Sequence, residues 1–178
     1  KTKEFELFHP KGSFTDDSIL TIATADWIVN GGEIATYYAK YAEQYPWPMG
    51  GYGGGFKLWS VQAITKQIYR PYNSYGNGSA MRVSSVAWLY HDLISVRRAA
   101  RLSAEITHNH PEGIKGALAT ADAIYLARIG SSKEEIKDHI EIRYDYDLDR
   151  TVDEIRPYYK FDVSCQGSVP ESIICFLE

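Results

Sequence analysis

The chain has 178 residues, of which 44% are apolar and 24% charged. This length and composition allow a substantial core, so we expect residues 1–178 to form a single domain. The apolar segment at residues 173–177 runs to the end of the chain without a helix stop, which suggests that this domain is truncated. The formal net charge of −4 disfavours binding to a nucleic-acid duplex or to an anionic membrane as the main activity.

The hydropathy of the chain predicts that the protein is located in the cytoplasm. No apolar run is long enough to span a bilayer, and residues 1–10 are charged and aromatic rather than signal-like. The two cysteines, Cys165 and Cys175, fit buried free thiols better than a disulfide framework. The sequence leaves the oligomeric state open.

Apolar residues recur at helical spacing along most of the chain, and capping residues, glycines and prolines mark the ends of these segments. The pattern predicts helices at residues 15–30, 33–45, 56–69, 80–90, 93–108, 111–129, 131–143, 151–156 and 170–177. Residues 49–55 and 70–78 are rich in glycine, proline or asparagine, which predicts irregular loops. Since no segment alternates as a strand would, the expected fold is all-α, a compact multi-helix domain.

The first candidate for chemistry is Thr15, Asp16 and Asp17, at the start of the first predicted helix. A hydroxyl and two carboxylates supply the hard oxygen ligands that magnesium prefers, and they leave coordination positions to water and substrate. The alternative is an ordinary helix start, because capping and the helix dipole favour the same residue types.

The second candidate is the loop at residues 50–55, in which five of six positions are glycine. Successive glycines let backbone amides approach an anion closely, and the helix expected from Phe56 offers a positive end, so a diphosphate would fit. The alternative is a flexible turn between helices. A dinucleotide-binding βαβ fold is excluded, since that fold requires a strand before the loop.

Two further stretches could contact a ligand. Residues 75–82 offer an aromatic face, amide and hydroxyl donors and a guanidinium, or form only a helix-entry loop. His108 and His110 lie before Pro111 and could bind a phosphate or ribose, or only cap the neighbouring backbone. A zinc site at these histidines is disfavoured because no further ligands lie in a suitable context.

An acidic stretch resembles the start of a calcium-binding loop without completing it. Asp145, Asp147 and Asp149 have the right spacing, but Arg150 stands where such a loop requires glycine and Arg156 where it requires glutamate. The sequence therefore favours a solvated acidic connector.

Four motifs follow one another along the chain. They are Phe-Thr-Asp-Asp-Ser at residues 14–18, Gly-Tyr-Gly at 51–53, Gly-Asn-Gly-Ser-Ala-Met-Arg at 76–82, and Thr-His at 107–108 followed by Pro111. Together they resemble the ADP-ribosylglycohydrolase family over nearly the whole chain. The resemblance implies an all-helical fold with two Mg²⁺ ions in a cleft, although oxygen ligands would also suit Mn²⁺.

The resemblance also implies roles for individual residues. It makes Thr15, Asp16 and Asp17 metal ligands and gives Asp16 and Asp17 a catalytic role. It assigns ADP-ribose binding to Gly51, Tyr52 and Gly53 at the diphosphate, to Asn77, Gly78, Ser79 and Met81 near the adenosine and distal ribose, and to His108 at the phosphates. The expected reaction is hydrolysis of the glycosidic bond that links ADP-ribose to a modified protein or a related acceptor.

Two features of the family have no match in this sequence. Family members carry an acidic residue upstream of the stretch where this chain begins, and a later Asp-x-Asp-Thr motif that completes the metal site. Two alternatives therefore stand beside the hydrolase: a non-catalytic, crystallin-like or truncated member that binds ADP-ribose, and a hydrolase of another ADP-ribose or nucleoside glycoside.

Overall fold

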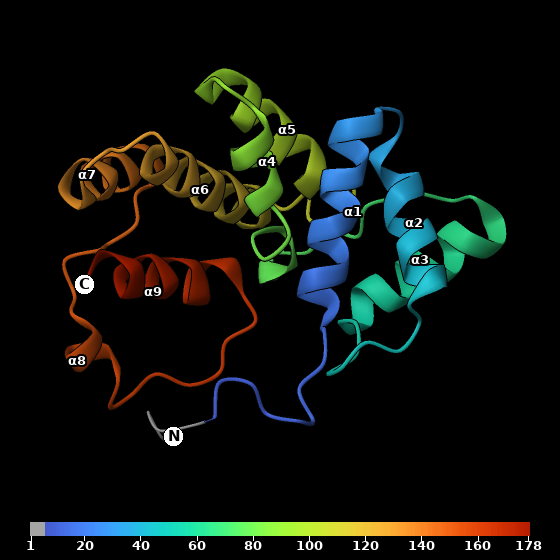
Figure 1. Ribbon diagram of the computed structural model, residues 1–178, viewed down its shortest axis with the longest axis horizontal. Helices are drawn as coiled ribbons and strands as arrows, with labels where there is room; N and C mark the ends of the chain where they lie inside the picture. Colours follow the sequence, from blue (N-terminus) through green and yellow to red (C-terminus); the bar gives the residue numbers. More distant parts are fainter. Residues whose placement is uncertain (1–5) are drawn as a thin grey trace.

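The computed structural model describes residues 6–178, and its regular structure is helical (Figure 1). The expected all-α fold is confirmed, because this part of the chain contains no strand and only two isolated bridges, Thr15 with Met49 and Gly76 with Ser164. The elements are α1 (Asp16–Asn30), α2 (Ile34–Gln44), α3 (Gly54–Lys66), the 3-10 turn η1 (Asn77–Ser79), α4 (Ser84–Leu89), α5 (Leu93–Glu105), α6 (Pro111–Arg128), α7 (Lys133–Tyr144), α8 (Val152–Ile155) and α9 (Cys165–Leu177).

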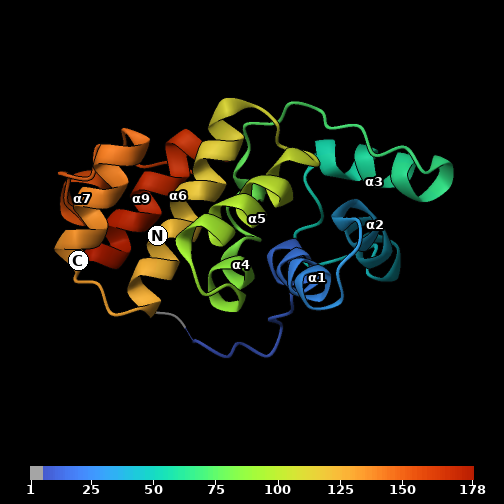
Figure 2. The same cartoon turned by 90° about the horizontal axis from the view of Figure 1, so that it is seen from above.

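Helix α6 is shared by two hydrophobic clusters. Ala117 and Ala121 pack into a cluster with α1 to α5, whereas Ala119 and Ala123 pack into a second cluster with α7, α8 and α9. From above, α6 lies between α4 and α5 on one side and α7 and α9 on the other (Figure 2). Small side chains on both faces of α6 let these helices approach closely.

Helices α6 and α9 approach each other closely at Gly116. A Cβ atom added at Gly116 would lie 2.4 Å from the Sγ atom of Cys165 and 2.7 Å from its Cβ atom. Only glycine therefore fits at this point of α6, and Cys165 is fully buried there.

Two helices begin earlier than the sequence predicted. Helix α3 includes Gly54 and Gly55, which were expected to be irregular. A Cβ atom at Gly55 would lie 2.6 Å from the ring of Tyr72, so the missing side chain makes room for this ring. The expectation that the glycines exclude regular structure was wrong for these two positions.

Helix α9 begins at Cys165 rather than at Pro170. The hydroxyl of Ser164 accepts a hydrogen bond from the Gly167 backbone N–H at 3.1 Å and caps the helix start. Pro170 lies inside the helix, where its missing N–H removes a backbone hydrogen bond. The expectation of two buried thiols was wrong for Cys175, which is exposed near the end of α9.

Within residues 6–178, no helix combines the length and the apolar character needed to cross a bilayer.

Candidate functional site

The start of α1 gathers three oxygen-bearing side chains. Thr15 precedes the helix in an extended conformation but makes no capping bond with its side chain; instead its hydroxyl donates to the Asp17 carboxylate at 2.8 Å. Burial raises the pKa of Asp16, and the neighbouring charge of Asp17 raises it further. Crowded carboxylates of this kind fit part of a divalent-cation site, because a cation would relieve their repulsion.

The glycine loop lies beside this helix start (Figure 1). The Met49 backbone N–H donates to the Phe14 carbonyl at 3.1 Å, and Thr15 forms an isolated bridge with Met49. Gly50 and Gly51 have φ values of 81° and 74°, a conformation that favours glycine. The fold therefore brings the first two candidate stretches together.

Tyr52 lies in the glycine loop, near enough to Asp16 of α1 to feel its charge. Its hydroxyl donates to the Tyr45 carbonyl at 2.9 Å. Burial, and then the negative charge of Asp16, raise the pKa of Tyr52 to about 12. Gly53 is the N-cap of α3, and the space where its Cβ atom would stand is open. The positive end of α3 thus begins next to the acidic start of α1.

The turn η1 is fixed against α9 and α6. The Asn77 backbone N–H donates to the Val163 carbonyl at 2.7 Å, and its side-chain amide donates to the Ser168 hydroxyl at 3.0 Å. Ser79 is fully buried and donates its hydroxyl to the Gly113 carbonyl at 2.7 Å. The side chain of Ser79 therefore holds the turn in place and is not presented to a ligand.

His108 lies directly behind this turn. A Cβ atom at Gly78 would lie 2.9 Å from the His108 Nε2 atom, and one at Gly76 would lie 3.6 Å from it. Burial, and then the positive charge of Arg82, lower the pKa of His108 to about 3, so the ring is neutral near pH 7. His110 instead caps α6, because its Nδ1 atom accepts the Glu112 backbone N–H at 3.1 Å, which confirms the capping alternative for this residue.

A cavity of about 670 Å³ joins the start of α1 to the turn η1. Asp17, Asn77 and Met81 all line it, together with side chains of α6 and α9. Residues 51–53 and His108 are outside its lining. Two of the predicted groups, at the start of α1 and at the turn η1, thus face one cavity, whereas the glycine loop and His108 lie outside its lining.

Two arginines near these groups were not foreseen as structural residues. The sequence offered the guanidinium of Arg82 as a possible ligand contact, but the side chain is completely buried, and no signal in the sequence indicated this burial. Arg128 lines the cavity and donates to the Trp88 and Tyr90 carbonyls at 3.3 and 2.7 Å. The sequence places Arg128 in the last turn of α6, where a positive charge interacts favourably with the helix dipole. It gave no sign of these two hydrogen bonds.

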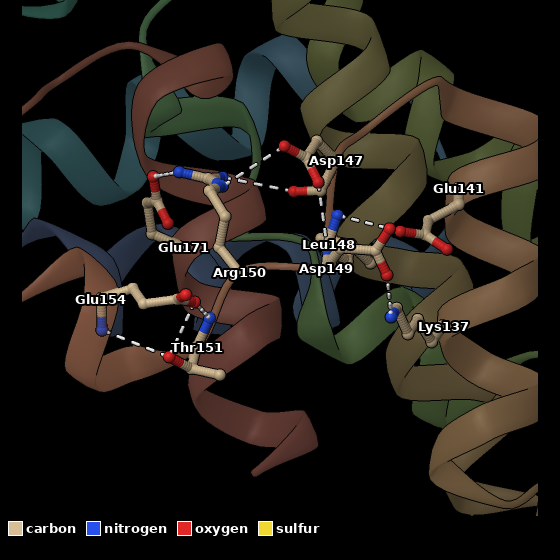
Figure 3. Close-up of polar contacts among 9 residues, drawn as sticks. All are labelled: Lys137, Glu141, Asp147, Leu148, Asp149, Arg150, Thr151, Glu154 and Glu171. Carbon is tan, nitrogen blue, oxygen red and sulfur yellow. Dashed lines mark hydrogen bonds and ion pairs between the residues drawn. The ribbon is translucent and has the colours of Figure 1, made fainter.

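The acidic connector is a separate feature (Figure 3). Carboxylate oxygens of Glu141, Asp147 and Asp149 lie within 4.8 Å of one another, the only such group of three metal-ligand side chains found in residues 6–178. Each carboxylate already has a partner: Asp149 pairs with Lys137, Asp147 with Arg150, and Glu141 accepts the Leu148 backbone N–H. The connector is therefore an internally paired acidic segment and carries no metal proposal.

Known proteins similar in sequence to this chain identify its family. The sequence profile described as ADP-ribosylglycohydrolase matches residues 2–173. ADP-ribosylhydrolase ARH3 of Mus musculus is 33% identical over 136 residues, which cover 68% of this chain and 36% of the mouse protein. The protein of the same name from Gallus gallus is 33% identical over 138 residues, covering 69% of this chain and 37% of its own length.

The human protein of that name is 35% identical over 112 residues, which cover 54% of this chain and 30% of the human protein. This chain thus spans about a third of the length of the curated relatives that it matches. The family match covers every residue of the candidate groups. The chain therefore belongs to the ADP-ribosylglycohydrolase family.

Proposed function

We propose that this chain binds ADP-ribose, within a protein that hydrolyses the glycosidic bond between ADP-ribose and a modified protein or a related acceptor. The observation that carries the proposal is the convergence of the four motifs. Asp16 lies near Tyr52, Asp17 and Asn77 share a cavity, and His108 lies behind the turn η1.

The groups have the chemistry that ADP-ribose requires. The glycine loop at 51–53 and the positive start of α3 suit the diphosphate, and the neutral His108 ring suits a phosphate oxygen as a hydrogen-bond donor. Asn77, Gly78 and Met81 would contact the adenosine and distal ribose. Ser79 supports them by fixing the turn.

We propose Mg²⁺ as the cofactor, two ions as in the family, with Thr15, Asp16 and Asp17 as ligands. Their three side chains supply oxygen ligands for part of an octahedral site, which leaves positions for water and the ribose hydroxyls. When bound, the metal would polarise the ribose and lower the pKa of a bound water.

Mn²⁺, which suits the same ligands, offers a test of this metal site. Paramagnetic broadening by Mn²⁺ should appear at the amides of Thr15, Asp16 and Asp17. Broadening confined to residues 141–149 would instead place the metal at the acidic connector.

The carboxylates of Asp16 and Asp17 would act on the water that attacks the anomeric carbon. As the glycosidic bond breaks, one of them would accept a proton from the water and a proton would be returned to the departing acceptor, while the negative charge of both favours a transition state with oxocarbenium character. The half-buried position of Asp16 strengthens this interaction, because burial reduces screening by solvent.

We also propose the class of substrate. The relatives are named ADP-ribosylhydrolases, and this chain spans about a third of their length, so ADP-ribosylated protein is the partner that we propose. The cytoplasmic location expected from the sequence stays a prediction.

Calorimetry with ADP-ribose, with and without Mg²⁺, tests the binding proposal. We expect binding that depends on Mg²⁺ and is lost in Asp16→Ala and in Asp17→Ala. Glu134→Ala is the matched control, since Glu134 is an exposed carboxylate in the first turn of α7. Equal binding by all four chains without metal would contradict the proposed metal site.

A second function, binding of ADP-ribose without hydrolysis, is favoured by one observation. Two carboxylates at the start of α1 are fewer than a dinuclear centre requires. Turnover assays with arginine-linked, serine-linked and other ADP-ribose glycosides separate the candidates. Metal-dependent release of ADP-ribose supports the hydrolase, whereas tight binding without release from any substrate supports the binding function.

A further inference from the structure

Arg82 is a fully buried cation at the centre of the fold. Its Nη2 atom donates to the Ser103 carbonyl at 2.6 Å and to the Thr107 hydroxyl at 2.8 Å, and its guanidinium carbon lies 4.3 Å from the centre of the Tyr38 ring. Its Nε and Nη1 atoms have no hydrogen-bond partner among the described residues. A buried guanidinium is costly, so the bonds that it does make constrain their acceptors strongly.

The first of the constrained acceptors is the hydroxyl of Thr107, which is also fully buried. A guanidinium can only donate, so the Thr107 oxygen accepts from Arg82. The same oxygen lies 2.7 Å from the His108 Nδ1 atom. A hydroxyl that accepts from a cation is polarised, which makes it a better donor and a poorer acceptor in its second hydrogen bond.

The direction of this second bond decides where the proton of His108 lies. If Thr107 donates to Nδ1, the neutral ring carries its proton on Nε2. The Nε2 atom faces the backbone of Gly76 and Gly78, and it packs so closely against Gly78 that a Cβ atom there would lie 2.9 Å from it. The opposite tautomer would present a lone pair there, which would repel a phosphate oxygen.

We propose that Thr107 is a positioning residue: held by Arg82, its hydroxyl keeps the proton of His108 on Nε2, so that the ring presents an N–H donor to a phosphate oxygen of the ligand beside Gly78. The identity of that ligand as ADP-ribose rests on the proposed function. The hydrogen-bond chain from Arg82 through Thr107 to His108 does not.

Nuclear magnetic resonance of the histidine ring nitrogens in the 178-residue chain tests the tautomer directly. We expect a His108 ring with a protonated Nε2 atom and an unprotonated, hydrogen-bonded Nδ1 atom. A ring protonated on Nδ1, or on both nitrogens, at pH 7 would overturn the proposal, and this measurement on the unaltered chain decides even if a variant fails to fold.

Two variants of Thr107 separate a positioning role from simple packing. Thr107→Val keeps the shape and removes the hydroxyl, so the Nδ1 signal should move to that of a nitrogen without a hydrogen bond, and ADP-ribose binding should weaken about tenfold. Thr107→Ser restores the hydroxyl and should restore both signals. Equal Nδ1 signals in the valine and serine variants would overturn the proposal.

These measurements distinguish failure of the proposed function from failure of the positioning proposal. If no chain binds ADP-ribose while the expected tautomer and its dependence on Thr107 are observed, the proposed function fails and the positioning of His108 stands. If the unaltered chain binds ADP-ribose with His108 protonated on Nδ1, the positioning proposal fails and the proposed function stands.

Discussion

Asp122 is the buried charge whose removal should damage the fold most. Its fully buried carboxylate accepts hydrogen bonds from Arg97 of α5 at 2.7 Å and from His139 and Tyr144 of α7 at 2.9 and 2.7 Å. A single side chain of α6 therefore ties together three helices. Asp122→Asn keeps the volume but removes the charge and turns one acceptor into a donor that faces other donors.

Loss of one partner from a buried ion pair costs about 3–5 kcal/mol. For a domain of this size, that loss lowers the melting temperature by roughly 6–20 °C. Unfolding by urea, followed by circular dichroism, measures the loss of free energy. Asp26→Asn is the matched control, because Asp26 makes the same kind of bonds to Lys40 and Tyr41 on the surface and should change stability little. Equal losses in the two variants would refute the reasoning that burial makes the Asp122 network strong.

Three further predictions concern His108, the thiols and the turn η1. The pKa of His108 is about 3 in the folded chain and near 6.5 in the unfolded chain, so the unfolded chain binds the proton more readily. The free energy of unfolding should therefore fall as the pH drops below 6.5, by about 2–3 kcal/mol at pH 4.5. Urea unfolding above pH 6.5 and at pH 4.5 should show this loss, and His108→Gln should lack it. Burial raises the pKa of Cys165 to about 11, whereas Cys175 is exposed. A thiol reagent at pH 8 should therefore modify one thiol rapidly in the folded chain and both thiols after unfolding. Rapid modification of both thiols in the folded chain would contradict the packing of α9. In Gly78→Ala, the new Cβ atom would lie 2.9 Å from the His108 Nε2 atom. This substitution should weaken ADP-ribose binding at least about tenfold without unfolding the chain. An unchanged affinity would show that His108 is not part of the binding site.

Most helices could be predicted because their ends carry local signals. Ser132 forms a capping box with Glu135 at the start of α7, and Pro111 stands in the first turn of α6. The early start of α9 was missed because Pro170 suggested a helix beginning, whereas the cap at Ser164 and the packing of Cys165 against Gly116 extend the helix backwards. Tertiary contacts of this kind have no local signature.

The candidate site was predictable as a set of motifs but not as an arrangement. Residue types at Thr15, Asp16 and Asp17 indicated oxygen ligands, yet only the fold shows that Asp16 lies near Tyr52. The burial of Ser79 follows from its hydrogen bond to α6, which sequence spacing does not reveal. Asp122 was missed although it was the one charge among the alanines of α6, a signal that can indicate a buried ion pair.

Amide chemical shifts of the labelled 178-residue chain, followed during titration with ADP-ribose in the presence of Mg²⁺, test the central claim most directly. Convergence of the four motifs on one ligand predicts shifts at residues 15–17, 51–53, 76–81 and 108, with little change along α7. Shifts confined to α7 and residues 141–150, or spread evenly over the surface, would contradict a single ADP-ribose site built from these motifs.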